Sequence, residues 1–207
     1  MKSSFLSALA ITIAFAGSVS AQTPAKPALT KPVLQIEPGA YAIDPYHTQV
    51  TFAVSHLGFT EFRGRLGDVS GTLQLDPGNP ANSTFDVTVP TASVNTPVDK
   101  LTDELKGEQW LDAKVNPEII FKAKSVTVTG PQTAKVTGDL TLHGVTKSLT
   151  LDAKLNRGGV NPLDKKFTVG FELAGKIKRS DFGVKTYLPL IGDEVDLTIS
   201  AAFEKQG

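Results

Sequence analysis

Three histidines are the side chains of this sequence most suited to chemistry, because an imidazole can act as acid, base or metal ligand near neutral pH. They are His47, His56 and His143. Their spacing forms no compact metal-binding motif, since His47 and His56 lie nine residues apart and face opposite sides of a regular strand. His143 falls in a tight turn between two strand-like segments. We therefore predict hydrogen-bonding histidines, with no metal site and no cofactor.

Signatures of catalysis are otherwise weak. The chain has no cysteine nucleophile, no Gly-x-Ser-x-Gly elbow and no phosphate-binding glycine loop. Its carboxylates are scattered, and the pair Asp99 and Asp103 has the spacing of a solvated helix face. We predict a binding protein with no catalytic residues. One alternative stays open, an enzyme acting on a small apolar substrate with His56 or His143 as its acid or base.

Cationic side chains could instead bind the head group of an amphiphile. Arg63 lies early in a long strand-like segment, and Arg179 lies in the loop before the last strand. Cations that converge at the mouth of a cavity can meet an anionic group. We take His56, Arg63 and Arg179 as head-group candidates. Overall, Lys+Arg 21 balances Asp+Glu 21, so we expect no nucleic-acid partner.

The elements that must position these residues are strands. Residues 48–56 (TQVTFAVSH) and 167–173 (FTVGFEL) alternate apolar and polar side chains. Such alternation gives a strand one apolar face and one wet face. Further segments of this kind lie near 41–44, 62–76, 83–89, 118–129, 134–142, 147–155 and 195–203. In 118–129 the phase slips between Ala123 and Val126.

About eight antiparallel strands with mostly short connections predict a closed lipocalin-like barrel, mainly β in class. The rival is a β-sandwich with a packed, dry core. Small residues on the inward phase, namely Gly138, Ala153, Gly175 and Ala201, favour a hollow barrel. One stretch departs from the strand pattern: Val98, Leu101 and Leu105 repeat at helical spacing before Gly107. It predicts a short helix, capped at Asn95 or Thr96, that flanks the barrel, with Trp110 packed beneath it.

The first 39 residues have a different character. Residues 1–21 combine Lys2, an apolar run and the small-residue sequence Val19-Ser20-Ala21, which predicts a cleavable signal peptide and export to the periplasm. Residues 22–39 contain four prolines and predict a flexible leader. The domain therefore comprises residues 40–207, and without cysteine it must be held together by its core alone.

The inward phase of the predicted strands defines a set of candidate ligand-binding residues. A one-residue slip would move a strand's whole apolar set outward, so the residues are predicted as a group. They are Val50, Phe52, Val54, Phe85, Val87, Phe121, Leu140, Leu142, Leu151, Val169, Phe171, Leu173, Leu197 and Ile199.

An ordered set of motifs resembles the YceI-like family of polyisoprenoid-binding, lipid-binding periplasmic proteins. The similarity extends from about Tyr41 to Phe203. The matching segments are 47–58 (HTQVTFAVSHLG), 62–64 (FRG), 105–112 (LKGEQWLD), 116–121 (NPEIIF), 137–147 (TGDLTLHGVTK), 179–183 (RSDFG) and 191–195 (IGDEV).

The resemblance implies an extended barrel that holds a long apolar ligand, such as a polyisoprenoid, a quinone or a related amphiphilic lipid. It implies a periplasmic location and leaves a homodimer open. It supplies no catalytic residues. A shuttle or storage protein of this kind would contact the membrane transiently. The alternative is a structural or stress-response interaction module whose barrel is filled by its own side chains.

Overall fold

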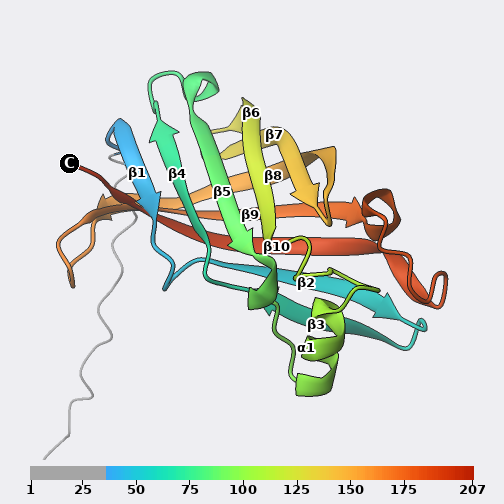
Figure 1. Cartoon of the computed structure of the whole chain (residues 1–207). Helices are drawn as coiled ribbons and strands as arrows, with labels where there is room; N and C mark the ends of the chain where they lie inside the picture. The colour runs from blue at the N-terminus through green and yellow to red at the C-terminus, as the bar shows by residue number, and fades with distance from the viewer. Residues whose placement is uncertain (1–35) are drawn as a thin grey trace, which may run out of the picture. The chain divides into compact units, whose positions relative to one another are not determined.

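The computed structural model describes residues 36–207, which form ten strand segments, one α-helix and three short 3₁₀ turns (Figure 1). The signal peptide predicted at 1–21 and most of the leader predicted at 22–39 lie outside the described residues. The first strands and turns are β1 (Gly39–Ile43), β2 (Gln49–His56), β3 (Thr60–Leu66), β4 (Ser70–Leu75), η1 (Pro80–Asn82), β5 (Thr84–Pro90) and η2 (Thr91–Ser93). They are followed by α1 (Asp99–Lys106), β6 (Glu118–Gly130), β7 (Thr133–Leu142), β8 (Val145–Val160), β9 (Phe167–Lys178), η3 (Arg179–Phe182) and β10 (Ile191–Lys205).

The sheet closes into an antiparallel barrel. Its strand order is β1-β4-β5-β6-β7-β8-β9-β10, and β10 pairs back onto β1. The remaining segments, β2 and β3, continue the sheet beyond β10. β1 and β2 pair with successive parts of β10, so together they act as one long strand. β4 pairs with β1 and β3 pairs with β2, so these two segments act as a second long strand. With the six strands β5 to β10, the barrel therefore has eight long strands. The predicted eight-stranded barrel with one flanking helix is thus confirmed.

The break between β1 and β2 has a clear physical cause in Pro45, which cannot donate a ladder hydrogen bond. The backbone of Ala202 in β10 is satisfied across this break by other groups. Asp44 N donates to Ala202 O at 2.9 Å, and Ala202 N donates to Thr48 Oγ1 at 3.0 Å. A threonine side chain therefore replaces a backbone partner, and the sheet bends without leaving a buried polar group unpaired.

Two further irregularities bend the sheet, and the second was predicted from the sequence. The glycine-rich segment 62–76 divides at Gly67–Val69, where Asp68 has a φ of 53°, and the chain turns sharply from β3 into β4. The phase slip in 118–129 is a register shift between Ala123 and Ser125 in the pairing of β6 with β7. Bulges of this kind increase local twist, which a small barrel needs in order to close.

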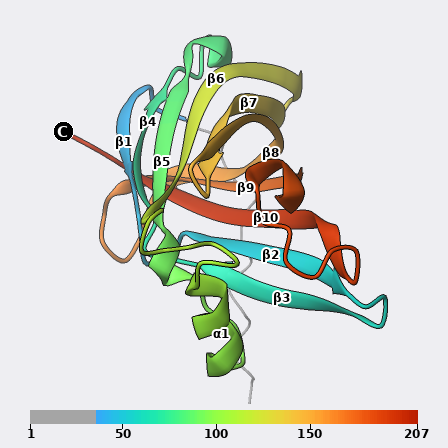
Figure 2. The same cartoon turned by 45° about the vertical axis from the view of Figure 1, so that its right-hand side comes forward.

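The barrel is not sealed by strand pairing along the edge of β3. That strand makes one isolated bridge, from Arg65 to Asn95, in place of a ladder with β5. Helix α1 lies beside β3 and the end of β5 in both Figure 1 and Figure 2. The helix starts at Asp99, later than the predicted cap, because the Thr96 hydroxyl bonds to Thr102 Oγ1 and to Val98 O.

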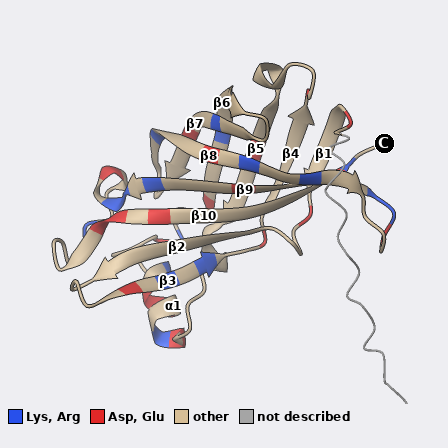
Figure 3. Cartoon of the chain, turned by 180° about the vertical axis from the view of Figure 1, so that it is seen from behind, with Lys and Arg blue, Asp and Glu red and all other residues tan. Residues whose placement is uncertain are grey.

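Charged residues of both signs are distributed along the strands (Figure 3). Several pair across neighbouring strands, such as Lys135 Nζ with Asp152 Oδ1 at 2.6 Å and Lys176 Nζ with Glu194 Oε2 at 3.1 Å. Opposite charges placed this way stabilise strand pairs modestly. Within residues 36–207, no helix has the length and hydropathy needed to span a membrane.

Candidate functional site

The barrel encloses a cavity of about 1000 Å³. Every strand segment contributes inward-facing residues, from Ile43 in β1 to Leu197 in β10. This volume lies at the upper end of the range of roughly 300–1,000 Å³ that is typical of small-molecule pockets. The lining is mainly aliphatic and aromatic, so the cavity is suited to a large apolar molecule.

Thirteen of the fourteen residues predicted from the strand phase lie on the cavity wall. Five of these are buried and the other eight are half-buried, as expected for side chains facing a hollow space. The buried residues are Phe121, Leu140, Leu142, Leu151 and Leu173. The half-buried residues are Val50, Phe52, Val54, Phe85, Val87, Phe171, Leu197 and Ile199. Their contact with a ligand stays a prediction.

Val169 is the exception, because it lies outside the cavity wall. It points inward, yet its side chain is completely buried, as is that of Tyr41. The Tyr41 ring packs edge-on against Phe167, with centroids 6.5 Å apart. At this end the barrel is therefore filled by its own side chains, and the free space begins beyond this layer.

The small residues on the inward phase do not all create the cavity. A Cβ atom at Gly138 would lie 2.6 Å from the Phe121 ring, and one at Gly175 would lie 2.6 Å from Leu151. The space beside these glycines is thus occupied by side chains of neighbouring strands. Ala153 and Ala201 do line the cavity. The inference from small residues to a hollow barrel was wrong for the two glycines.

Sequence reasoning missed the part of the wall that lies outside the strands. Leu101 and Leu105 of α1 line the cavity, together with Trp110 and Tyr187. The Trp110 and Tyr187 rings pack edge-on with centroids 6.2 Å apart. The spacing of Leu101 and Leu105 did identify an apolar helix face, but the gap between β3 and β5 that this face covers is a property of the closed barrel.

Arg179 lines the cavity, but its hydrogen bonds are directed at the protein backbone. Its side chain donates to the carbonyl oxygens of Gly192, Val184 and Ile191 at 2.8, 3.1 and 2.9 Å. The guanidinium carbon also lies 5.4 Å from the centroid of the Trp110 ring. Desolvation by burial lowers the pKa of Arg179. This arginine therefore holds the loop before β10 in place, and its role towards a head group stays a prediction.

The other two head-group candidates are separated from each other. His56 ends β2 and lies at the cavity rim. Arg63 is exposed, forms an ion pair with Glu61 and lies outside the cavity wall. The difference follows from strand alternation, because Arg63 is on the outward phase of β3 whereas its neighbour Phe62 is on the inward phase.

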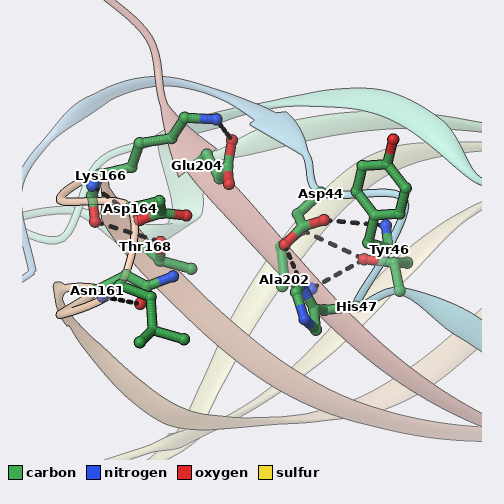
Figure 4. A network of polar contacts seen from close by, with 11 residues as sticks. Asp44, Tyr46, His47, Asn161, Asp164, Lys166, Thr168, Ala202 and Glu204 are labelled. Carbon is green, nitrogen blue, oxygen red and sulfur yellow. Dashed lines mark hydrogen bonds and ion pairs between the residues drawn. The ribbon is translucent and has the colours of Figure 1, made fainter.

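The remaining two histidines make hydrogen bonds within the protein and do not line the cavity. His143 Nδ1 lies 3.0 Å from the carbonyl oxygen of Phe182. His47 Nδ1 lies 2.5 Å from Asp44 Oδ2 on the outer face, within the polar network of Figure 4. The hydrogen bond with Asp44 raises the pKa of His47. Partial burial would raise the pKa of Asp44, but hydrogen bonds from His47 and from the backbone of Tyr46 lower it overall.

Polar chemistry inside the cavity is sparse. Among the described residues, the ionisable side chains on its wall are His56, Glu104, Arg179 and Tyr187. Glu104 accepts a hydrogen bond from Trp110 Nε1 at 3.3 Å. Across residues 36–207 there is no group of three or more side chains that could jointly hold a metal ion. This geometry suits retention of an apolar molecule by burial of its surface.

A model of the YceI-like domain matches residues 41–203, which is nearly the whole barrel from β1 to β10. The chain belongs to the YceI-like family. Protein YceI of Escherichia coli O6:H1 (strain CFT073) is 41% identical over 162 residues, which cover 77% of this chain and 84% of that protein.

Solved structures share the YceI-like fold. BcnA of Burkholderia cenocepacia has a TM-score of 0.70 at 24% identity, covering 77% of this chain and 98% of that one. A polyisoprenoid binding domain from Saccharophagus degradans has a TM-score of 0.63 at 14% identity, covering 82% of this chain and 100% of that one. At these identities the two likenesses show a common fold.

Proposed function

We propose that this protein binds a long-chain apolar ligand inside its barrel and stores or carries it in the periplasm. The ligand class is a polyisoprenoid, a quinone or a related amphiphilic lipid. The observation that carries the proposal is the cavity of about 1000 Å³ with an apolar wall built by all ten strand segments. Family membership and the polyisoprenoid binding domain of the same fold support it.

The size of the cavity limits the ligand. If a methylene group occupies roughly the 30 Å³ of a liquid water molecule, the cavity volume corresponds to about 33 such groups, or six to seven isoprene units. Each methylene moved from water into the barrel contributes roughly 0.8 kcal/mol. A chain of several isoprene units is therefore much more stable in the barrel than in water, before the entropic cost of ordering the chain is subtracted.

Transfer between a bilayer and the barrel is a different equilibrium. Lipid tails are as apolar as the cavity wall, so movement of the ligand from one to the other is close to neutral. A protein of this kind acts as a reversible carrier or buffer. Location in the periplasm rests on the signal peptide predicted at residues 1–21.

Native mass spectrometry of protein purified without detergent tests the proposal. We expect a bound mass that organic extraction assigns to an isoprenoid, a quinone or a fatty amphiphile. The variant Phe171→Asp should lose this mass, because the carboxylate would require water on the apolar wall. An empty wild-type protein that also takes up no added prenol would contradict the proposal. A folded Phe171→Asp protein that keeps the ligand would contradict the assigned cavity face.

The two alternatives make different demands on the barrel. A barrel filled by its own side chains fits the layer of Tyr41 and Val169 but does not account for the free volume beyond it. Of the two histidines considered for catalysis, His56 reaches the cavity wall, whereas His143 does not. No observation on this wall favours catalysis over binding.

A further inference from the structure

Two loops at one end of the barrel expose large apolar side chains. The β2–β3 turn carries Leu57 and Phe59, which are 46% and 85% exposed. The loop between η3 and β10 carries Tyr187 and Leu190, which are 59% and 61% exposed. We call these four residues the apolar tip. Exposed apolar side chains that cluster in this way usually mark an interaction surface, whereas single exposed ones do not.

The two loops form one unit. Leu57 N donates to Leu190 O at 3.0 Å, and Ile191 pairs with His56 where β2 ends and β10 begins. In both Figure 1 and Figure 2 the β2–β3 turn and the loop before β10 project side by side from the barrel. The four side chains therefore lie close enough together to contact one surface.

Backbone geometry gives no stability reason for these residue types. Leu57 has a φ of 56° and Tyr187 a φ of 60°, in the left-handed region that disfavours such side chains. Asparagine or glycine would suit these positions better. Tyr187 also packs against Trp110, but an exposed leucine in this conformation at position 57 stabilises neither the turn nor the core. A contact outside the monomer would account for its presence.

The apolar tip is continuous with the cavity. Tyr187 belongs both to the tip and to the cavity wall, and the adjoining His56 and Ile191 also line the cavity. A mainly apolar path thus leads from the exposed loops into the barrel. A ligand tail entering beside Tyr187 would pass the ionisable His56 and then reach the mainly apolar wall formed by the strands.

The area and charge of the tip favour a bilayer over a second copy of the chain. Four side chains of these types and exposures offer on the order of 500 Å², whereas a standard interface needs about 800 Å² per partner. Residues 55–60 and 183–192 contain Lys185 and no carboxylate, and the carboxylates of Glu61 and Asp193 begin directly after these two segments. Aromatic and aliphatic side chains with an adjacent lysine are the composition that binds the surface of an anionic membrane.

We propose that the apolar tip docks on an anionic lipid bilayer and places the cavity entrance beside Tyr187 against the lipid. This inference rests on the proposed binding function, since docking serves to pass a tail between bilayer and barrel. Tyr187 is shared by the tip and the cavity wall, but Phe59 and Leu190 belong to the tip alone. Docking and ligand binding can therefore fail separately.

Flotation with vesicles of phosphatidylcholine containing phosphatidylglycerol tests docking. The double variant Phe59→Asp, Leu190→Asp should reduce the vesicle-bound fraction by at least about tenfold, because two charges replace the inserting side chains. The matched control is Leu163→Asp, since Leu163 is 91% exposed in the β8–β9 loop, away from the tip. It should bind vesicles as the wild type does. Equal vesicle binding by the double variant and the wild type would overturn the proposal.

A second pair of measurements separates docking from ligand binding. Equilibrium uptake of a fluorescent prenol in solution should be unchanged in the double variant, which also shows that it is folded. Its rate of prenol uptake from vesicles should fall about tenfold with docking. If the wild type floats with vesicles but takes up no prenol, the binding function fails and docking stands. If the double variant changes a dimer into a monomer in sedimentation and floats normally, the tip is a self-association surface and the proposal fails.

Discussion

Filling the cavity from within should shorten the longest chain that the protein can hold. Ala153 in β8 lines the cavity and pairs with Ala134 and Leu173, which line it as well. The substitution Ala153→Phe adds about six carbon atoms to the wall at a site that borders free space. The new ring should therefore enter the cavity without displacing a neighbouring strand.

The expected change in ligand affinity follows from the volume of the cavity. In the wild type, affinity for linear alcohols should rise by about 0.8 kcal/mol, or roughly fourfold, for each methylene. The rise should stop near about 30 carbons, when the cavity is full. In Ala153→Phe the slope should be the same, but the plateau should come about six carbons earlier. The longest ligands should lose up to about 5 kcal/mol of binding free energy.

Displacement of a fluorescent fatty probe by alcohols of increasing length gives both the slope and the plateau. The matched control is Ala174→Phe, which adds the same ring to an exposed position on the neighbouring strand. It should reproduce the wild-type curve. A folded Ala153→Phe protein whose affinity reaches its plateau at the same chain length as the wild type would show that the tail does not occupy this cavity. An affinity that does not rise with chain length would refute burial of apolar surface as the driving force.

Three further predictions concern stability. Arg179→Lys should lower the free energy of unfolding in urea by about 2–4 kcal/mol, because one ammonium cannot reach three carbonyl groups. Unchanged stability together with lost ligand affinity would instead favour a head-group role for Arg179. The His47–Asp44 pair should stabilise the fold most between about pH 4 and 6.5. Because the pKa of His47 is raised, its contribution to stability is lost as the pH rises through that pKa. Because the pKa of Asp44 is lowered, its contribution is lost as the pH falls through that pKa. Melting temperatures measured across and beyond this pH range should fall on both sides of the window, and His47→Gln should remove the fall on the alkaline side. Gly138→Ala would place a methyl group 2.3 Å from a backbone oxygen of β6 and should destabilise by about 1–3 kcal/mol, whereas Gly170→Ala meets nothing within 4 Å and should melt like the wild type.

Strand alternation predicted most of the cavity wall because the side-chain period of a strand is two. Once one inward residue in a strand was identified, its alternate neighbours followed, and Phe85 and Val87 illustrate this in β5. The same rule failed to distinguish Val169 from Phe171. Both point inward, but only tertiary packing determines that the space beside Val169 is filled whereas the space beside Phe171 is free.

Polar residues were harder to assign than apolar ones. Arg63 and Arg179 looked equivalent as cations near strand ends, yet one is an exposed ion-pair partner and the other is buried among backbone carbonyls. The distinction depends on how the loop before β10 folds around Arg179. Such long-range contacts have no local sequence signal, because the carbonyl groups that accept the hydrogen bonds are present in every residue.

By itself the sequence determined the class of fold, the number of strands, the flanking helix and most of the side chains that face inward, because these follow from local periodicity. The closure of β10 onto β1, the gap beside β3 covered by α1, and the meeting of Trp110 with Tyr187 were decided by the tertiary structure. The physical reason is that alternation specifies which face of a strand is apolar. Only the closed barrel determines how much of the space between those faces the side chains fill.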